Sequence, residues 1–311
     1  MQKNNWGILV FILILIIGIS GINCTRAPKI PIGAGLYLDQ NINSIPLLKK
    51  NLILLKLKGL KTIQIEIPVS TGNSGLPEID SAIYLKLKII NPWVHDLFPD
   101  WSLAFTRMHP DSLYPPEQQT GWVPNSLQLS SNSASVWVSA YLKVNLAYLN
   151  ACKFPPPLLI WGENLPWYEK QPQMKLSLDS LRNIYHGKIS WTFSPDNALP
   201  NWAKELDIFS FNWYPQTQEP PYYFVRKLHP QISAFSKKLN KPIRLSSVSL
   251  RKGKAYLDFC QLQEAWDAPI YPTAAILVSL SELPVWEDSI SPGGLAKEAY
   301  IHKLIDEIFA P

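Results

Sequence analysis

Short apolar runs and longer amphipathic stretches alternate along the chain from residue 34 to residue 309. The short runs are bounded by Pro, Gly, Asn or Asp, a pattern typical of buried β-strands. The longer stretches repeat apolar residues at intervals of three and four, which predicts amphipathic α-helices. The predicted strands span residues 34–38, 62–67, 102–106, 158–162, 188–193, 208–212, 243–246 and 274–280. The predicted helices span residues 45–58, 79–97, 136–153, 176–185, 201–206, 225–239, 254–266 and 295–309.

Strict alternation of strands and helices predicts an α/β fold with a parallel sheet. Eight repeats in this length predict a single (β/α)8 TIM barrel over residues 34–311. The main rival is an open doubly wound sheet, which usually carries a glycine-rich turn after its first strand. Here Gly33 and Gly35 stand at the start of the first apolar run, so we interpret them as a turn and not as a phosphate loop. We also expect a helix bent or broken at Pro92 and a long polar loop over residues 109–135.

The N-terminal residues 1–23 have the layout of a secretory signal, with one positive charge followed by the apolar residues 6–19. Cys24 follows, in a context that resembles a bacterial lipoprotein processing box, although Asn23 departs from the usual small residue. We predict that Cys24 is lipidated and that residues 24–33 form a tether to the barrel. An uncleaved membrane anchor and simple secretion are the alternatives. The expected location is the bacterial cell envelope, membrane-anchored on the periplasmic side or the cell surface.

Composition argues against several partners. The 311 residues are 47% hydrophobic and 17% charged, and the net charge of +5 forms no Lys/Arg block with interleaved aromatics, which argues against nucleic acid. The 5 histidines are scattered without ligand spacing, so we expect no metal and no cofactor. We interpret Cys152 and Cys260, in separate predicted helices, as independent buried thiols and not as a disulfide. We expect a monomer.

In a (β/α)8 barrel the functional residues lie on the loops that follow the strands. Here the strand ends carry polar and aromatic residues: Asp39, 68–70, 107–109, Glu163 with Asn164, 194–196, 212–214, Ser247, Glu282 and 286–288. The aromatic residues on this face are Trp122, Trp167, Trp213, Tyr214 and Trp286, each of which on its own is more often a packing residue. Ring faces beside carboxylates and amides suit a sugar, which offers CH faces for stacking and hydroxyls for hydrogen bonds. We therefore predict a carbohydrate site that includes Asn164, Asp196, Asn212, Trp213, Tyr214 and Trp286.

Three stretches resemble a known family: residues 159–165, 181–190 and 202–215. They are similar to the clan-A glycoside hydrolases, and most closely to the mannanase-like TIM-barrel family 113, and the likeness extends over residues 33–309. The first stretch resembles the family's fourth strand, so the resemblance implies that Glu163 is the catalytic acid/base. The third resembles its sixth strand, whose Asn-x-Tyr end lines the sugar site, which implies that role for Asn212 and Tyr214.

The family's nucleophile is a second glutamate, which ends the seventh strand in a Lys-Pro-apolar-apolar-x-x-Glu pattern. Residues 241–246 match the lead-in, and Ser247 holds the glutamate position. A retaining glycosidase needs two carboxyl groups about 5–5.5 Å apart, and a serine without an adjacent base is a poor nucleophile. Glu282, Asp196 or Asp39 could supply a substitute carboxylate, including at the about 6.5–9.5 Å spacing of an inverting mechanism.

The sequence therefore predicts an exported barrel lipoprotein that binds a polysaccharide or oligosaccharide, with hydrolysis impaired or lost. One alternative is an active mannanase-like β-glycosidase that uses Glu163 and a relocated second carboxylate. The other is a non-catalytic envelope scaffold. Two further carboxylates are expected outside the site: Glu66, in mid-strand, inside the barrel or toward a helix, and Asp207, at the start of a strand, on the opposite face.

Overall fold

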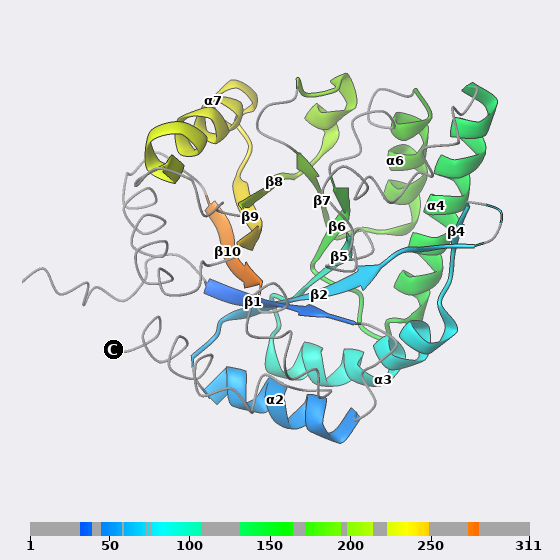
Figure 1. Ribbon diagram of the computed structural model, residues 1–311, viewed down its shortest axis with the longest axis vertical. Coiled ribbons are helices and arrows are strands. Elements are labelled where there is room, and N and C mark those ends of the chain that lie inside the picture. Colours follow the sequence, from blue (N-terminus) through cyan, green and yellow to red (C-terminus); the bar gives the residue numbers. More distant parts are fainter. Residues whose placement is uncertain are drawn as a thin grey trace, which may run out of the picture.

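The strands form a ring surrounded by helices (Figure 1). This computed structural model describes residues 32–38, 45–57, 59–72, 74, 76–106, 131–163, 172–193, 198–213, 223–248 and 273–279. The ring strands are β1 (Ile32–Tyr37), β2 (Thr62–Pro68), β5 (Ser102–Thr106), β6 (Leu158–Glu163), β7 (Lys188–Phe193), β8 (Ile208–Trp213), β9 (Ile243–Val248) and β10 (Thr273–Ser279). The helices are α2 (Ile45–Leu57), α3 (Ser81–Leu97), α4 (Ser131–Ala151), α6 (Pro172–Ile184), α7 (His229–Leu239) and the short turns η2 (Asn201–Glu205) and η3 (Phe224–Leu228).

The ring follows the order β1-β10-β9-β8-β7-β6-β5-β2 and closes where β2 pairs with β1. All of these pairs are parallel. The predicted α/β barrel is therefore confirmed. The helices predicted over residues 254–266 and 295–309 lie outside the described residues, so the strict eightfold alternation stays a prediction, as do the domain limits. A small antiparallel pair, β3 (Ser70–Thr71) with β4 (Pro77–Glu78), follows β2 and was not expected.

Helix α3 continues through Pro92, so of the predicted bend or break the break is wrong and the bend stays a prediction. Its first turn is capped by Asp80, whose carboxylate accepts hydrogen bonds from two backbone N–H groups at 2.8 and 3.1 Å. Next to the proline, the buried Asn91 side chain exchanges two hydrogen bonds with the backbone of Phe154, at 2.8 and 2.9 Å. These tertiary contacts help to offset the backbone hydrogen bond that a proline removes from a helix.

Smaller differences concern the ends and types of helices. Helix α4 begins at Ser131, inside the stretch predicted as a loop, and α6 begins at Pro172, a residue type that suits the first position of a helix. The predicted helix 201–206 is the 3-10 helix η2, and the predicted helix 225–239 begins with the π-helical turn η3.

The hydrophobic core fills the layer between the strands and the surrounding helices. Successive residues of a strand point to opposite sides, and the apolar residues of β2, Ile63, Ile65 and Ile67, are all buried in this core. In the same outer layer, next to β6 and β7, Trp161, Trp191 and Trp202 pack edge to face. Their ring centroids are 5.4 Å (Trp161–Trp191), 5.5 Å (Trp191–Trp202) and 6.1 Å (Trp161–Trp202) apart. These large rings fix β6 and β7 against each other.

The inside of the ring contains a set of buried polar side chains. Its buried polar residues include Gln64, Glu66, Ser102, Ser190, Ser210, Arg244 and Ser246. The Gln64 amide donates to the Ser246 carbonyl at 3.0 Å, although β2 and β9 are not neighbours in the ring. This hydrogen bond therefore crosses the interior of the barrel from β2 to β9. TIM barrels more commonly fill this space with branched apolar side chains.

At the amino-terminal ends of the strands, Asp207 is part of the scaffold. Its carboxylate accepts hydrogen bonds from Arg182 Nη2 at 2.6 Å and from the backbone N–H of Ile189 at 2.8 Å. This pair holds the start of β7 and the chain before β8 together. The expected place of Asp207, away from the site, is confirmed.

Candidate functional site

Glu163, to which the family resemblance assigns the acid/base role, is the last residue of β6. Its backbone lies opposite Thr192 of β7, after an irregularity in the pairing that follows Ile160. A carboxylate at this place stands at the carboxyl end of a barrel strand, which is the end that carries function in this architecture.

The peptide before Glu163 is held by close packing around Gly162. A Cβ atom at Gly162 would lie 2.6 Å from Trp191 Cζ3 and 2.7 Å from the Tyr141 hydroxyl oxygen, so the position has room only for glycine. The same hydroxyl donates a hydrogen bond of 2.6 Å to the Trp161 carbonyl. Helix α4 and strand β7 therefore fix the backbone on which Glu163 stands.

Strands β8 and β9 bring two more predicted site residues together. Asn212 lies opposite Ser247, after a register shift in the pairing of the two strands. Asn212 is half-buried at the end of β8. Ser247, the position that the family resemblance assigns to the nucleophile, is therefore beside the predicted sugar-binding Asn212 in the ring.

Trp213 does not offer the exposed ring face that a stacked sugar needs. Its side chain is 2% exposed, and its ring packs against Phe224 of η3 with a centroid separation of 4.6 Å. The sequence could not separate these roles, because the burial depends on Phe224, which belongs to another element, η3. Trp213 is therefore best described as a packing residue beneath the strand end.

Several predicted residues lie outside the described ranges: Cys24, Asn164, Asp196, Tyr214, Glu282, Trp286, and also Asp39, Trp122, Trp167 and Cys260. Their roles stay predictions. The predicted loop 109–135 is described only from residue 131 onward, where it is helical.

The ring interior holds a charged cluster centred on Arg244 of β9. Its guanidinium donates from Nη2 to Ser102 Oγ at 2.6 Å and to Gln64 Oε1 at 3.2 Å. Gln64 in turn donates to Glu66 Oε1 at 3.0 Å. Burial lowers the pKa of Arg244 to about 9, and the negative charge of Glu66 acts in the opposite direction. The predicted interior position of Glu66 is confirmed.

Sequence reasoning missed this cluster, although one signal was available. Gln64 and Glu66 are two residues apart on one strand and therefore share a face. Arg244 stands between two apolar residues in a strand, which points a charge to the opposite side from the hydrophobic core. A strand with an acidic inward face and a strand with a basic inward face in the same ring together predict an interaction between the two charges inside the barrel.

Carboxylates are scarce on the barrel strands. Within the bounds of the eight described ring strands the sequence contains two acidic residues, Glu66 and Glu163. Glu66 belongs to the Arg244 cluster. Of these two residues, Glu163 is the one at the carboxyl end of its strand.

Metal and membrane-spanning features are absent from the described part of the chain. No group of three His, Cys, Asp or Glu side chains there could hold a metal ion. None of the helices in the described ranges is long and apolar enough to cross a bilayer. Cys152 is a half-buried thiol, and burial raises its pKa to about 12.

Comparisons with known proteins place the fold among glycoside hydrolase barrels. A family 113 β-1,4-mannanase superposes with a TM-score of 0.61 at 12% identity, over 91% of this chain and 99% of that one. A family 5 glycoside hydrolase from Prevotella bryantii gives 0.55 at 11% identity, over 90% and 95%. A β-1,4-mannanase from the sea hare Aplysia kurodai gives 0.54 at 8% identity, over 91% and 93%. No protein family model and no curated protein sequence matches the chain. At these identities the likeness concerns the fold.

Proposed function

We propose that this chain is an exported, lipid-anchored barrel of the family 113 mannanase type that binds a polysaccharide or oligosaccharide and has impaired or lost hydrolysis. The observation that carries the proposal is the place of Ser247, in register with Asn212 at the strand end where the family resemblance expects the nucleophile. Glu163 ends β6, at the position that the family resemblance assigns to the acid/base.

The chemistry follows from what a glycosidic bond requires. Its hydrolysis by either standard mechanism needs two carboxyl groups, one of which protonates the leaving oxygen while the other acts as nucleophile or activates water. Serine at position 247 cannot supply the second charge. Glu66 is engaged in the Arg244 cluster, which leaves Glu282, Asp196 and Asp39 as the candidates for a relocated partner.

Binding a sugar requires fewer specific groups than hydrolysing its glycosidic bond. A sugar needs hydrogen-bonding groups and an aromatic face, which we assign to Glu163, Asn164, Asp196, Asn212, Tyr214 and Trp286. Trp213 is left out of this set because its ring is buried. The similar structures include mannanases, and one similar structure is a complex with a xyloglucan oligosaccharide, so β-linked mannans and glucans are the first ligands to test.

The experiment is a screen of β-linked polysaccharides with the full-length chain, in which binding and release of reducing ends are both measured. The proposal expects binding without release. The Ser247→Glu variant is expected to gain release, and the further change Glu163→Gln is expected to abolish that gain. Release by the natural chain that disappears in Glu163→Gln would identify the active-glycosidase alternative, and absence of binding to any glycan would favour the scaffold alternative.

The anchor is tested separately. We expect labelled palmitate to enter the natural chain and not the Cys24→Ala variant, and we expect the natural chain to fractionate with the cell envelope. Labelling that persists in Cys24→Ala would overturn the lipoprotein assignment, and membrane association of an unlabelled, uncleaved chain would identify the membrane-anchor alternative.

A further inference from the structure

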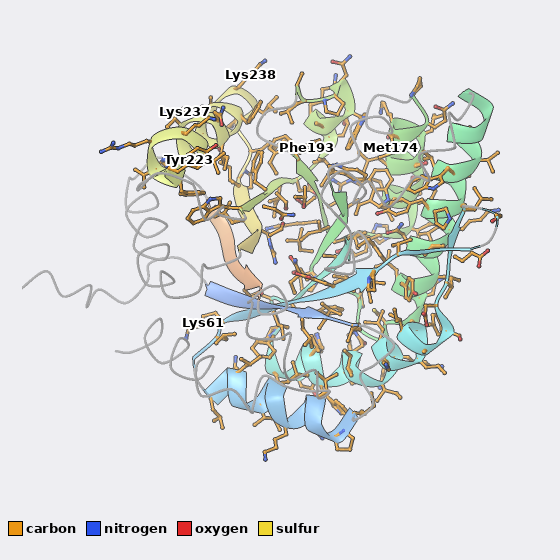
Figure 2. The ribbon with its side chains drawn as sticks, in the orientation of Figure 1. Lys61, Met174, Phe193, Tyr223, Lys237 and Lys238 are labelled. Carbon is orange, nitrogen blue, oxygen red and sulfur yellow. The ribbon has the colours of Figure 1, made fainter. Side chains whose placement is uncertain are left out.

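Polar residues on the inside of the ring lie in layers that lead from the amino-terminal ends of the strands toward the candidate site. In a barrel of eight parallel strands, inward residues of alternate strands share a layer. Arg244 of β9 and Ser102 of β5, joined by a hydrogen bond of 2.6 Å, belong to one layer near the amino-terminal ends. Two residues farther along the same set of strands, the layer consists of Gly35, Ala104, Thr192 and Ser246. Thr192 directly precedes Phe193, which Figure 2 labels at the carboxyl end of β7.

This second layer has small side chains, none larger than that of threonine. TIM barrels more commonly place branched apolar residues in such a layer. Here the space is used by the Gln64 side chain of β2, whose amide donates to the Ser246 carbonyl and to Glu66 Oε1, both at 3.0 Å. The small layer therefore makes room for a polar column of Arg244, Gln64 and Glu66.

The column ends at the level of the predicted sugar-binding Asn212. Gln64 pairs with Ser102, and Ser210 pairs with Arg244, each one strand on in the same direction around the ring, so Gln64 and Ser210 share a layer. Glu66 and Asn212, each two residues farther along its strand, share the next layer of that set. The exposed fraction rises in this direction, from 0% at Ser102 to 6% at Glu66, and Asn212 is half-buried. Glu66 therefore lies at the floor of the candidate site.

Arg244 favours the ionised form of Glu66. The negative charge of Glu66 raises the pKa of Arg244 against the effect of burial, and this attraction is mutual, so the positive charge stabilises the carboxylate. Gln64 connects the two groups, because it accepts from Arg244 Nη2 at 3.2 Å and donates to Glu66. The column thus has its positive end near the amino-terminal ends of the strands and its negative end at the floor.

We propose that Glu66 is a specificity-determining residue of the sugar site, where its carboxylate accepts hydrogen bonds from glycan hydroxyl groups and repels glycans that carry carboxylates. The inference rests on the proposed glycan-binding function. Hydrogen bonds to an ionised acceptor are stronger than those between neutral groups. A uronic acid ring at the same place would bring a second carboxylate against Glu66, and like charges across an interface cost affinity. Gln64 and Arg244 are positioning residues, because they act through Glu66.

The test compares two glycans that differ in one group per ring. The full-length chain is titrated calorimetrically with the β-1,4-linked mannose hexamer and with the matching mannuronate hexamer, in which a carboxylate replaces each hydroxymethyl group. If the polysaccharide screen identifies a glucan, the glucose and glucuronate hexamers form the pair. We expect the natural chain to bind the neutral hexamer about tenfold to a hundredfold more tightly. This comparison requires no variant.

A variant without the two charges assigns the selectivity to the column. Glu66→Gln with Arg244→Gln removes both charges together and so leaves no unpaired buried charge. We expect it to narrow the ratio of the two affinities by about tenfold. The matched control is Ser190→Ala, because Ser190 is also buried inside the ring but its hydroxyl pairs with that of Ser210, away from the floor. This control is expected to leave the ratio unchanged.

Three results would overturn the proposal while the glycan-binding function stands. The first is equal binding of the two hexamers, or tighter binding of the acidic one, by the natural chain. The second is an equal loss of affinity for both hexamers in the double variant, which would show a structural role alone. The third is an equal narrowing of the ratio in Ser190→Ala. Absence of binding to either hexamer and to every glycan in the screen would overturn the proposed function together with this inference.

Discussion

The two sides of the same barrel strands differ in chemistry. The outer side packs large apolar rings, such as Trp161 and Trp191, against the helices. The inner side joins Gln64, Ser102 and Arg244 by hydrogen bonds across the ring. Apolar packing in the outer layer is non-directional, and any α/β barrel needs a layer of this kind. The hydrogen bonds of the inner cluster, in contrast, require particular partner residues. The comparison indicates that the outer layer provides most of the stability, while the inner one fixes which strands face each other.

The largest expected loss follows from breaking the inner cluster on one side. Arg244→Leu removes the donor to Ser102 and Gln64 and the charge that faces Glu66, and we expect it to lower the free energy of unfolding by about 3–5 kcal/mol. Thermal unfolding of the full-length chain in mild detergent measures this. The double variant Arg244→Leu with Glu66→Leu is expected to be about 1–3 kcal/mol more stable than the sum of the single losses predicts. Strict additivity would show that the two groups are not coupled.

A substitution in the outer layer should lower the free energy of unfolding by a similar amount, but its effect should not be coupled to that of Arg244→Leu. Trp191→Ala leaves a cavity between the rings of Trp161 and Trp202, and we expect a loss of about 3–5 kcal/mol. In the double variant Trp191→Ala with Arg244→Leu, the two losses of stability should add, because the two side chains lie on opposite sides of the sheet. The matched control is Leu176→Ala at an exposed position, expected within about 0.5 kcal/mol of the natural chain. A cooperative effect of the double variant would contradict the separation of the two layers.

Gly162 links the outer layer to the site, so its substitution should affect both stability and function. Gly162→Ala forces a methyl group against Trp191 and Tyr141, and we expect a loss of about 1–3 kcal/mol together with weaker glycan binding. Tyr141→Phe removes one of the two close atoms, so the double variant should recover part of the loss. If Gly162→Ala is as stable as the natural chain, the packing around this peptide is looser than the distances indicate.

The smallest expected effect concerns Cys152 and alkaline pH. Burial raises the pKa of this thiol to about 12, above its unfolded value, so the folded state binds the proton more tightly. Its contribution to stability is fully present below the unfolded pKa and is lost as the pH rises through the folded pKa. We expect unfolding measurements to show stability declining above about pH 9, and Cys152→Ala to flatten that decline. An unchanged slope in Cys152→Ala would contradict the assignment.

Local pattern predicted the elements well and the contacts between them poorly. Strands β5 and β7 have the predicted bounds because apolar runs between breakers are a local signal. The Arg244 cluster was missed, because its partner Gln64 is 180 residues away in sequence and only ring closure brings them together. Trp213 was predicted at the sugar site, and its burial depends on Phe224, which a strand-end pattern does not contain. The crowded place of Gly162 likewise depends on Trp191 and Tyr141, from two other elements.

The central claim is that Ser247 stands where a catalytic carboxylate has been lost. The most direct measurement is the release of reducing ends from a glycan that the chain binds, compared between the natural chain and Ser247→Glu. The account predicts binding without release for the natural chain and measurable release for Ser247→Glu that also requires Glu163. Release by the natural chain, lost on Glu163→Gln, would contradict it and show that a second carboxylate elsewhere completes the site.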